Sequence, residues 1–249
     1  MFLPKKVLKR EFLMSSEAKK EPNSFVFAII MCLVCGLLLT AAAVGLKSRQ
    51  TQNVIVDQQK NILKALGLLP QKKLKNNEVQ QLFNQAVSKR YMTADGNILM
   101  ENQQNTQELY IIESATGIEK YAIPFKAYGL WSWIYGYLAM QGDGQTIAGF
   151  TVYAHGETPG LGGECEKPWF QNQFVGKKIV DLSGKFTSIG VVKGKVQDSI
   201  PAQEQYRYVD GMSGATITGK GIEKHLKIEL EKYEPLSKKL RLNQHKGKG

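Results

Sequence analysis

Residues Asp210–Gly221, DGMSGATITGKG, place three hydroxyl groups among four glycines directly before a helical pattern. The hydroxyls belong to Ser213, Thr216 and Thr218. A helix N-terminus offers unpaired N–H groups and partial positive charge, so it favours a phosphate by about 0.3–1 kcal/mol. Glycines let the backbone approach such an anion closely. The stretch fits a phosphate site beside Ser213 and Thr216, and it fits equally a loop in which Thr218 caps a helix that starts at about Gly219.

A second glycine-rich stretch, GETPGLGGE at Gly156–Glu164, follows a predicted strand. Thr158-Pro159-Gly160 suits a type II turn, because proline pre-sets φ at the second position and glycine accepts a positive φ at the third. The glycines at 162 and 163 let the backbone approach a neighbour closely. The loop is either pressed against a flat ligand, with Leu161 as an apolar contact, or it is a tight connection. Composition alone favours the connection.

Hydrophobic periodicity predicts helices at both ends of the globular part and short strands between them. Helices are predicted at residues 51–70 with a stop at Gly67 and Pro70, from Val79 to near Arg90, and from the SGAT loop to a stop at Pro235. Strands are predicted at 108–114, 130–140, 145–155 and 185–194, and the second of these fits equally a short helix that leads into a strand. The glycines around Asp143 predict a hairpin between the second and third of these strands. This order of elements favours an α+β fold over a doubly wound sheet. The sequence has no P-loop or dinucleotide fingerprint, and its histidines lack metal-ligand spacing.

Residues 25–46, FVFAIIMCLVCGLLLTAAAVGL, form a run of 22 residues without a charge. At 1.5 Å per residue a helix of this length spans roughly 33 Å, the thickness of a bilayer core. The run is too long for the hydrophobic part of a cleaved signal peptide, and no A-x-A cleavage pattern follows it cleanly. We therefore predict a single transmembrane helix with the lipid bilayer as a partner.

Flanking charges indicate how this helix is oriented. Six Lys/Arg residues precede it and three follow it closely, so the positive-inside rule predicts a cytoplasmic N-terminus and residues 47–249 outside. Met14 begins MSSEAKKEPNSF, which can itself serve as a start, and we hypothesise that it is the true one. In that case only Lys19 and Lys20 remain upstream. An intact mass that includes residues 1–13 would refute this start.

The formal charge of +11 is concentrated in the termini. Residues 236–249 carry five Lys/Arg and no acid, which we interpret as a solvated, disordered tail. There is no basic stripe interleaved with aromatic residues, so no nucleic-acid partner is expected.

Cys32 and Cys35 lie inside the apolar run and act there as small apolar residues, while Cys165 stands alone. The external domain must therefore be stabilised by its core rather than by disulfides.

The DGMSGAT stretch resembles the flavinylation motif D-x-x-[ST]-G-A-T, in which a flavin transferase esterifies the phosphate of FMN onto the last threonine, here Thr216. The ordered set CLVC, QKNIL with GLL, GLWSWIYGYLA, HGETPGLGGE and PWFQNQFVGKK is similar to the NqrC family of sodium-translocating NADH:quinone reductases, from Ser24 to Leu236. The paralogous G component of Rnf ferredoxin:NAD complexes shares the SGAT and ETPG elements, but GLWSWIYGYLA and the GGE after ETPGLG fit NqrC better. The first 13 residues and the basic tail depart from the pattern without touching the motif.

This resemblance implies an oxidoreductase subunit that passes single electrons within a complex that oxidises NADH, reduces ubiquinone and pumps Na⁺. It implies FMN held covalently through Thr216, the other subunits as partners, a flavin transferase during maturation, and a periplasmic FMN domain on the bacterial inner membrane. No general acid, general base or metal ligand is expected. The implied contacts are Glu157, Thr158, Gly160, Leu161 and Gly162 near the flavin ring, Ser213, Gly214 and Ala215 beside the phosphate, and Thr218 at the helix start, with Trp131 and Ser132 as further candidates for the ring. Trp131 fits a core position equally well.

The expected organisation is one N-terminal transmembrane helix followed by an extracytoplasmic mixed α/β flavin-binding domain, α+β in class. The predicted segments are a cytoplasmic tail at 1–24, the transmembrane helix at 25–46, a helical segment at 47–90, the FMN-binding domain at 91–235 and the basic tail at 236–249. Two other functions stay open from the residues. One is the G component of an Rnf-type complex, which co-purifying subunits would reveal. The other is an anchored binding domain without a redox role, which would lack covalent yellow colour.

Overall fold

The computed structural model describes residues 23–115 and 117–246, and the chain divides into two compact units at Gln50 and Thr51. The hypothesis that Met14 is the start, and most of the expected cytoplasmic tail, lie outside the described residues. The longer helices and strands are α1 (Ser24–Ala65), α2 (Asn76–Ala86), β1 (Ser88–Met92), β2 (Ile98–Leu99), β3 (Gln107–Ser114), β4 (Gly117–Tyr128), β5 (Trp133–Gln141), β6 (Ile147–Ala154) and α5 (Thr216–Lys246). The short elements between β6 and α5 are η1 (Gly162–Glu166), α3 (Pro168–Gln171), η2 (Asn172–Phe174), β7 (Gly190–Val191), α4 (Val196–Ser199), η3 (Ala202–Arg207) and β8 (Tyr208–Val209). The predicted α+β class is confirmed.

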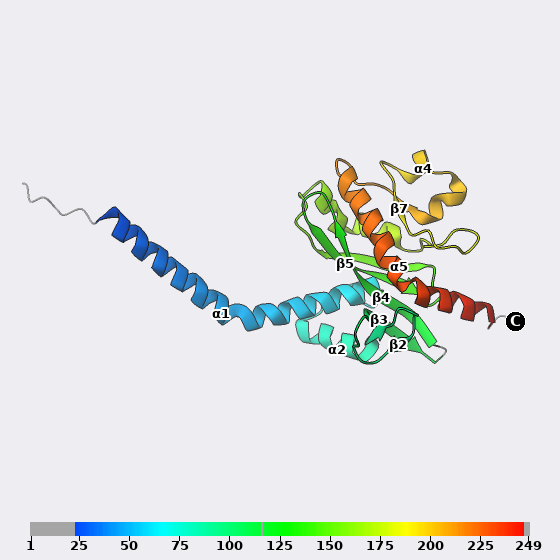
Figure 1. Ribbon diagram of the computed structural model, residues 1–249, viewed down its shortest axis with the longest axis horizontal. Helices are drawn as coiled ribbons and strands as arrows, with labels where there is room; N and C mark the ends of the chain where they lie inside the picture. Colours follow the sequence, from blue (N-terminus) through cyan, green and yellow to red (C-terminus); the bar gives the residue numbers. More distant parts are fainter. Residues whose placement is uncertain (1–22, 116, 247–249) are drawn as a thin grey trace, which may run out of the picture. The chain divides into compact units, whose positions relative to one another are not determined.

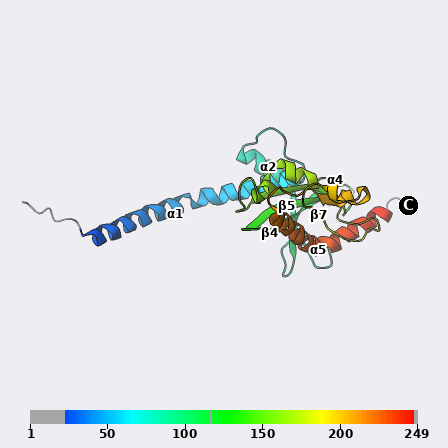
Figure 2. The same cartoon turned by 90° about the horizontal axis from the view of Figure 1, so that it is seen from above.

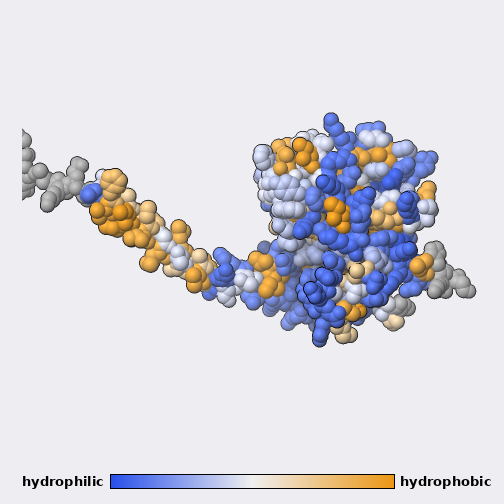
Figure 3. All heavy atoms as spheres, in the orientation of Figure 1, coloured by the Kyte–Doolittle hydropathy of each residue, from blue (hydrophilic) through white to orange (hydrophobic). Residues whose placement is uncertain are grey.

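Helix α1 is long and apolar enough to cross a membrane, by length and composition. Its most apolar window has a mean hydropathy of 2.7, and none of that window is buried within the protein. Figure 3 shows apolar side chains crowding this part of the helix. The helix continues without a break to Ala65, so the two helices predicted at residues 25–46 and 51–70 are one. It ends where predicted, because Gly67 adopts a φ of +74° that stops helical geometry.

Six strands form one antiparallel sheet in the order β2-β1-β3-β4-β5-β6. The hairpin predicted around Asp143 is confirmed: β5 pairs with β6, and the Asp143 carboxylate accepts the N–H groups of Gln145 and Thr146 at 2.9 and 2.8 Å. Strand β4 is the longest and lies between β3 and β5, yet none of the predicted strands covers it. Pro124 falls in its middle, where proline ordinarily argues against a strand.

Alternation along the strands separates two apolar cores, one on each face of the sheet. On β5, Ile134, Leu138 and Met140 face a core that also contains Ile222, Leu226 and Leu230 of α5. Tyr137 and Ala139 face the other core, where the end of α1 and helix α2 pack. Figures 1 and 2 show α5 crossing the sheet on one side, with α2 beside the strands β1–β3. The globular unit is therefore a sheet between two helical layers, with α5 as one of them.

Two predicted boundaries are wrong. Helix α2 ends at Ala86 and β1 begins at Ser88, so the helix expected to reach Arg90 stops earlier, at a Val87 that is already extended. The strand expected at 185–194 is reduced to β7, Gly190–Val191. Ser188 takes a φ of +67°, which turns the chain away from an extended path.

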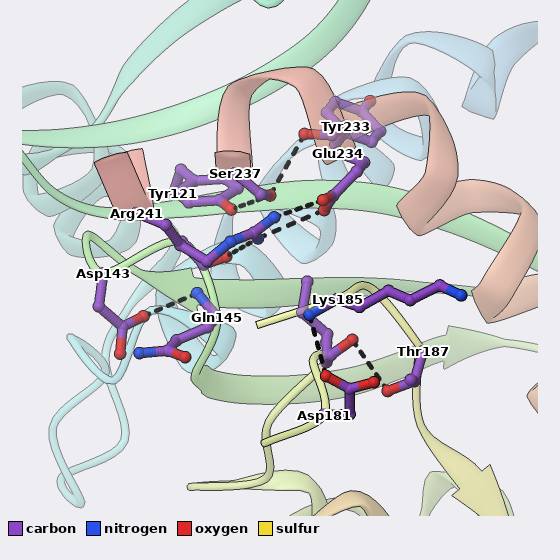
Figure 4. Close-up of polar contacts among 12 residues, drawn as sticks. Tyr121, Asp143, Gln145, Asp181, Lys185, Thr187, Tyr233, Glu234, Ser237 and Arg241 are labelled. Atoms are coloured by element: carbon purple, nitrogen blue, oxygen red, sulfur yellow. Dashed lines mark hydrogen bonds and ion pairs between the residues drawn. The ribbon is translucent and has the colours of Figure 1, made fainter. Parts of the chain in front are cut away.

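The stop expected at Pro235 is also wrong, because α5 continues through Pro235 to Lys246. Leu236 is buried, and Tyr233 before the proline donates its hydroxyl hydrogen to the Glu108 carbonyl at 2.6 Å. Tyr121 and Ser237 share a buried hydrogen bond of 2.7 Å, which Figure 4 shows. A proline inside a helix costs about 3 kcal/mol, and this packing offsets that cost.

The basic tail is helical over its described part rather than a solvated, disordered end. Arg241 forms an ion pair with Glu234 and donates to the Gly144 carbonyl at 2.8 Å. Its guanidinium therefore closes α5 onto the β5–β6 hairpin. The tail prediction failed because it counted charges and overlooked the apolar stripe of Leu236 and Leu240.

Candidate functional site

Three segments that are distant in sequence meet around the first turn of α5. They are the turn at 129–132, the glycine-rich loop at 156–164 and the loop at 210–215. A cavity of about 270 Å³ lies between them. Its lining residues are Leu130, Trp131, Glu157, Thr158, Leu161, Gly162, Gly214, Ala215, Thr216, Ile217 and Thr218. The wall is largely apolar at Leu130, Leu161 and Ile217, so the cavity suits a flat apolar group.

The glycine-rich loop folds as its residues predict. Leu161 donates its N–H to the Thr158 carbonyl at 3.1 Å, and Gly160 has a φ of +75°, as a type II turn requires. Gly163 donates to the same carbonyl at 3.0 Å. These bonds turn the chain sharply and leave the Leu161 side chain 43% exposed at the cavity wall.

Helix α5 begins at Thr216, and Thr218 is not its N-cap. Thr218 is only 1% exposed and donates its hydroxyl hydrogen to the Glu157 carboxylate at 2.6 Å. The helix starts earlier than predicted because Gly219 already donates its N–H to the Ala215 carbonyl at 3.0 Å. The first-turn N–H groups of residues 216–218 have no partner inside the helix, so they remain available to an anion.

Thr216 is exposed on the first turn of α5. Its hydroxyl makes no hydrogen bond with any residue that the structure describes, so it is free to react. Gly214 precedes it with a φ of +71°, and a Cβ there would lie 2.7 Å from the Leu161 side chain. The two glycine-rich loops therefore approach each other beside Thr216, and the positive φ of Gly214 is a conformation that glycine adopts without strain.

Glu157 is the one charged residue among the described residues that line the cavity, and it is buried. Its carboxylate accepts the N–H groups of Leu130, Trp131 and Ser132 at 3.2, 2.8 and 3.0 Å, in addition to the Thr218 hydroxyl. Burial opposes ionisation, but these donors outweigh it and hold the pKa of Glu157 below its usual range. The carboxylate is therefore charged at neutral pH.

A second groove, of about 720 Å³, lies on the other side of Thr216. Gly214 and Thr216 line both spaces. The groove is lined by Gly160, Glu164, Trp169, Lys193, Gly194, Lys195, Gly211, Met212, Ser213, Gly214 and Thr216. Lys195 pairs with Asp210 at 2.9 Å, while Lys193 has no ion pair among the described residues. The groove therefore offers lysine side chains that the small cavity lacks, together with the Glu164 carboxylate.

Comparison with known proteins identifies the fold that carries this site. Residues 129–231 match the FMN-binding domain family. The NqrC subunit of the Na(+)-translocating NADH-quinone reductase of Yersinia pestis is 34% identical, with 88% of this chain and 92% of the relative covered. The chain belongs to the NqrC family. The corresponding protein of Pseudomonas aeruginosa is 31% identical over 84% of this chain and 91% of its own length.

Solved structures of NqrC proteins have the same fold. The crystal structure from Parabacteroides distasonis superposes with a TM-score of 0.66 at 30% identity and covers 77% of this chain and 96% of that one. The Shewanella oneidensis structure gives a TM-score of 0.63 at 24% identity, with 78% and 99% covered, and supports the fold alone.

Sequence reasoning named most residues that come together here. Eight of them line the small cavity: Glu157, Thr158, Leu161, Gly162, Gly214, Ala215, Thr216 and Thr218. Gly160 and Ser213 line the neighbouring groove instead. Trp131 is 67% exposed at the cavity, so it is not a core residue, and Ser132 serves the scaffold by accepting the Gly156 N–H at 2.6 Å.

Sequence reasoning missed Leu130 and Ile217 on the small cavity, and Lys193, Lys195 and Trp169 on the groove. Leu130 and Ile217 each adjoin a residue that had been singled out, so neighbours in the same turns were the available signal. Lys193 gave no signal, because it lay in a segment predicted as a strand, and Lys195 follows directly after that segment.

Proposed function

We propose that this chain is a membrane-anchored electron-carrier subunit of a Na⁺-translocating NADH:ubiquinone reductase, with FMN attached to Thr216 through a phosphoester. The observation that carries the proposal is an exposed, unbonded threonine hydroxyl at a helix N-terminus, beside an apolar cavity, in a chain of the NqrC family. The FMN-binding match supports the cofactor. A bound FMN would supply one-electron chemistry that amino-acid side chains lack.

The residues present fit such a cofactor. The N–H groups of the first turn of α5 would hold the phosphate, and Lys193 of the groove adds positive charge. Leu130, Leu161 and Ile217 would exclude water from the ring. Covalent attachment would keep the flavin at a shallow site, because it removes the cost of repeated association.

No side chain of the cavity has to act as an acid or a base in this function. Glu157 accepts four hydrogen bonds, which occupy the four lone-pair positions of a carboxylate. A flavin transferase would form the bond between phosphorus and the Thr216 oxygen, with the net loss of one water from FMN and threonine. The chain's own task is to position and tune the ring.

The same proposal covers location and partners. Helix α1 would anchor the chain in the bacterial inner membrane with its N-terminus in the cytoplasm and the FMN domain in the periplasm. The other subunits of the complex would donate and accept the electrons. The lipid bilayer and a flavin transferase complete the set of partners.

The test is denaturing gel electrophoresis of the full chain co-expressed with a flavin transferase, viewed under ultraviolet light. A fluorescent band is expected, with FMN minus water on the peptide that contains Thr216. T216A is expected to give a dark band and an unchanged urea midpoint, because Thr216 is exposed. Flavin retained by denatured T216A would refute the attachment.

S213T is the matched control, because Ser213 is a second exposed hydroxyl of the same glycine-rich stretch and occupies the motif position at which serine or threonine occurs. It keeps a hydroxyl at that position and is expected to keep the fluorescent band. If S213T were also dark, the wild-type peptide mass would still locate the attached residue.

A further inference from the structure

One carboxylate organises the small cavity. A Cβ on Gly129 would lie 2.6 Å from the Glu157 Oε1, and a Cβ on Gly162 would lie 2.4 Å from Oε2. Both glycines lie directly against the carboxylate, since a side chain at either position would collide with it. Sequence reasoning placed Glu157 near a flavin ring as a contact. The structure shows that the carboxylate oxygens accept three backbone N–H groups and the Thr218 hydroxyl.

The bonds of Glu157 join three segments of the site. Oε1 accepts from Trp131 and Ser132, and Oε2 accepts from Leu130 and from Thr218. The turn at 129–132 carries Leu130 and Trp131, which form one wall, and Thr218 lies one residue beyond Ile217 on α5. The carboxylate thus fixes the distance between that wall and the turn of α5 that begins with Thr216.

The charge of Glu157 has no cationic partner within residues 23–115 and 117–246. It is 4% exposed and forms no ion pair with any lysine or arginine that the structure describes. Main-chain N–H dipoles and one hydroxyl stabilise it instead, and these donors carry no net charge. A negative charge in a poorly solvated wall acts over a longer range than one in water.

We infer that Glu157 is the positioning residue of the flavin cavity and that its fixed negative charge lowers the reduction potential of a flavin held there. The inference rests on the proposed function. Each electron that enters the flavin adds a negative charge unless a proton follows it, so a neighbouring carboxylate disfavours the reduced form. Two unit charges about 10 Å apart at an effective dielectric constant of about 20 change such an equilibrium by roughly tenfold.

The primary experiment measures the midpoint potential of the flavin-loaded full chain by spectroscopic redox titration. E157Q keeps the side-chain length and removes the charge. We expect its midpoint potential to be more positive, by the amount that corresponds to a roughly tenfold larger equilibrium constant for reduction. E166Q is the matched control, because Glu166 is an exposed carboxylate at the end of η1, two residues after the glycine-rich loop, where it contacts His155 and Lys167. Its midpoint should stay at the wild-type value. Equal midpoints for wild type and E157Q would overturn the inference about charge.

Positioning is measured separately with Thr218. T218V removes the hydroxyl donor and keeps both the shape and the Glu157 charge, so the flavin should become more mobile, with lower fluorescence anisotropy, while its midpoint moves little. T218S should restore the anisotropy. Unchanged anisotropy in T218V would overturn the positioning role. If E157Q fails to fold, T218V still tests the positioning role, because it leaves every charge in place.

The failure of the inference is distinguishable from the failure of the proposed function. If wild-type protein carries no covalent flavin, the proposed function fails and no potential can be compared. If wild-type protein carries covalent flavin and E157Q has the same midpoint potential, the proposed function is supported and the proposed role of the Glu157 charge is refuted.

Discussion

The first turn of α5 and its later turns belong to one helix, yet they meet opposite surroundings. At the first turn Thr216 and Ile217 are exposed, and Ile217 is 61% accessible to solvent. Beyond Pro235, Leu236 is 4% exposed, and Ser237 is hydrogen-bonded to Tyr121. The far end of the helix is packed against the sheet, whereas the near end is open.

This difference teaches how a shallow site can be held in place. In the proposed function the near end has to stay exposed, because its threonine would meet both a cofactor and the enzyme that attaches it. Its position therefore depends on contacts elsewhere: the apolar face of α5 on the sheet, the far-end bonds, and the single buried tie from Thr218 to Glu157. A helix transmits such positioning well because its backbone bonds keep it stiff.

The largest expected effect is on the free energy of unfolding, when one apolar residue is truncated near each end of α5. L236A should lower the free energy of unfolding by about 2–5 kcal/mol, because it removes a buried side chain and leaves a cavity. I217A should change it by less than about 0.5 kcal/mol, because Ile217 is already in water. Urea unfolding of both variants checks the pair. Similar losses for the two would show that the near end is packed after all.

The second largest expected effect concerns Gly144, the glycine of the β5–β6 hairpin that lies against α5 near Ser237. Gly144 has a φ of +67°, and a Cβ there would lie 2.3 Å from the Ser237 carbonyl oxygen. G144A should therefore be destabilised by about 1–3 kcal/mol through the collision, beyond the cost of the positive φ.

G176A is the matched control for Gly144, because Gly176 has a φ of +80° and open space around it. It should show the conformational cost alone, about 1 kcal/mol. If G144A and G176A lost equal stability in urea unfolding, the close approach of α5 to the hairpin would be absent in solution.

The sequence predicted those parts of the fold that depend on local chemistry. The stop at Gly67, the hairpin at Asp143 and the turn at Gly160 each follow from the φ preferences of a few adjacent residues. Strand β4 and the passage of α5 through Pro235 did not follow, because proline is locally unfavourable in both. Long-range packing decided them, and periodicity over one segment does not contain that packing.

The site shows the same division. Its glycine-rich loops and Thr216 are visible in the sequence because their residue types are unusual. The meeting of Glu157 with Thr218 and with the 129–132 turn joins segments far apart along the chain, and no local pattern shows it. The interpretation of Thr218 as an N-cap was wrong for this reason, since a helix start seen alone gives its threonine no other partner.

The smallest expected effect is the pH dependence of the stability that the Glu157 carboxylate contributes at the first turn of α5. The folded pKa of Glu157 lies below its ordinary value of 4.5, so its ionised form favours the folded state. That contribution is complete above about pH 4.5 and is lost as the pH falls through the folded pKa. E157Q lacks it, so the difference in unfolding free energy between wild type and E157Q should be constant from neutral pH down to mildly acidic pH and then narrow.

Urea unfolding at a series of pH values measures this difference. Asp181, Asp210 and Glu166 also have lowered pKa values, but they are present in both proteins, so their contributions cancel in the comparison. A difference that stays constant down to the lowest pH at which both proteins fold would mean that the Glu157 charge adds nothing to folding. The near end would then be held by the shape of the carboxylate alone, and the contrast between the two ends of α5 would be one of packing without electrostatics.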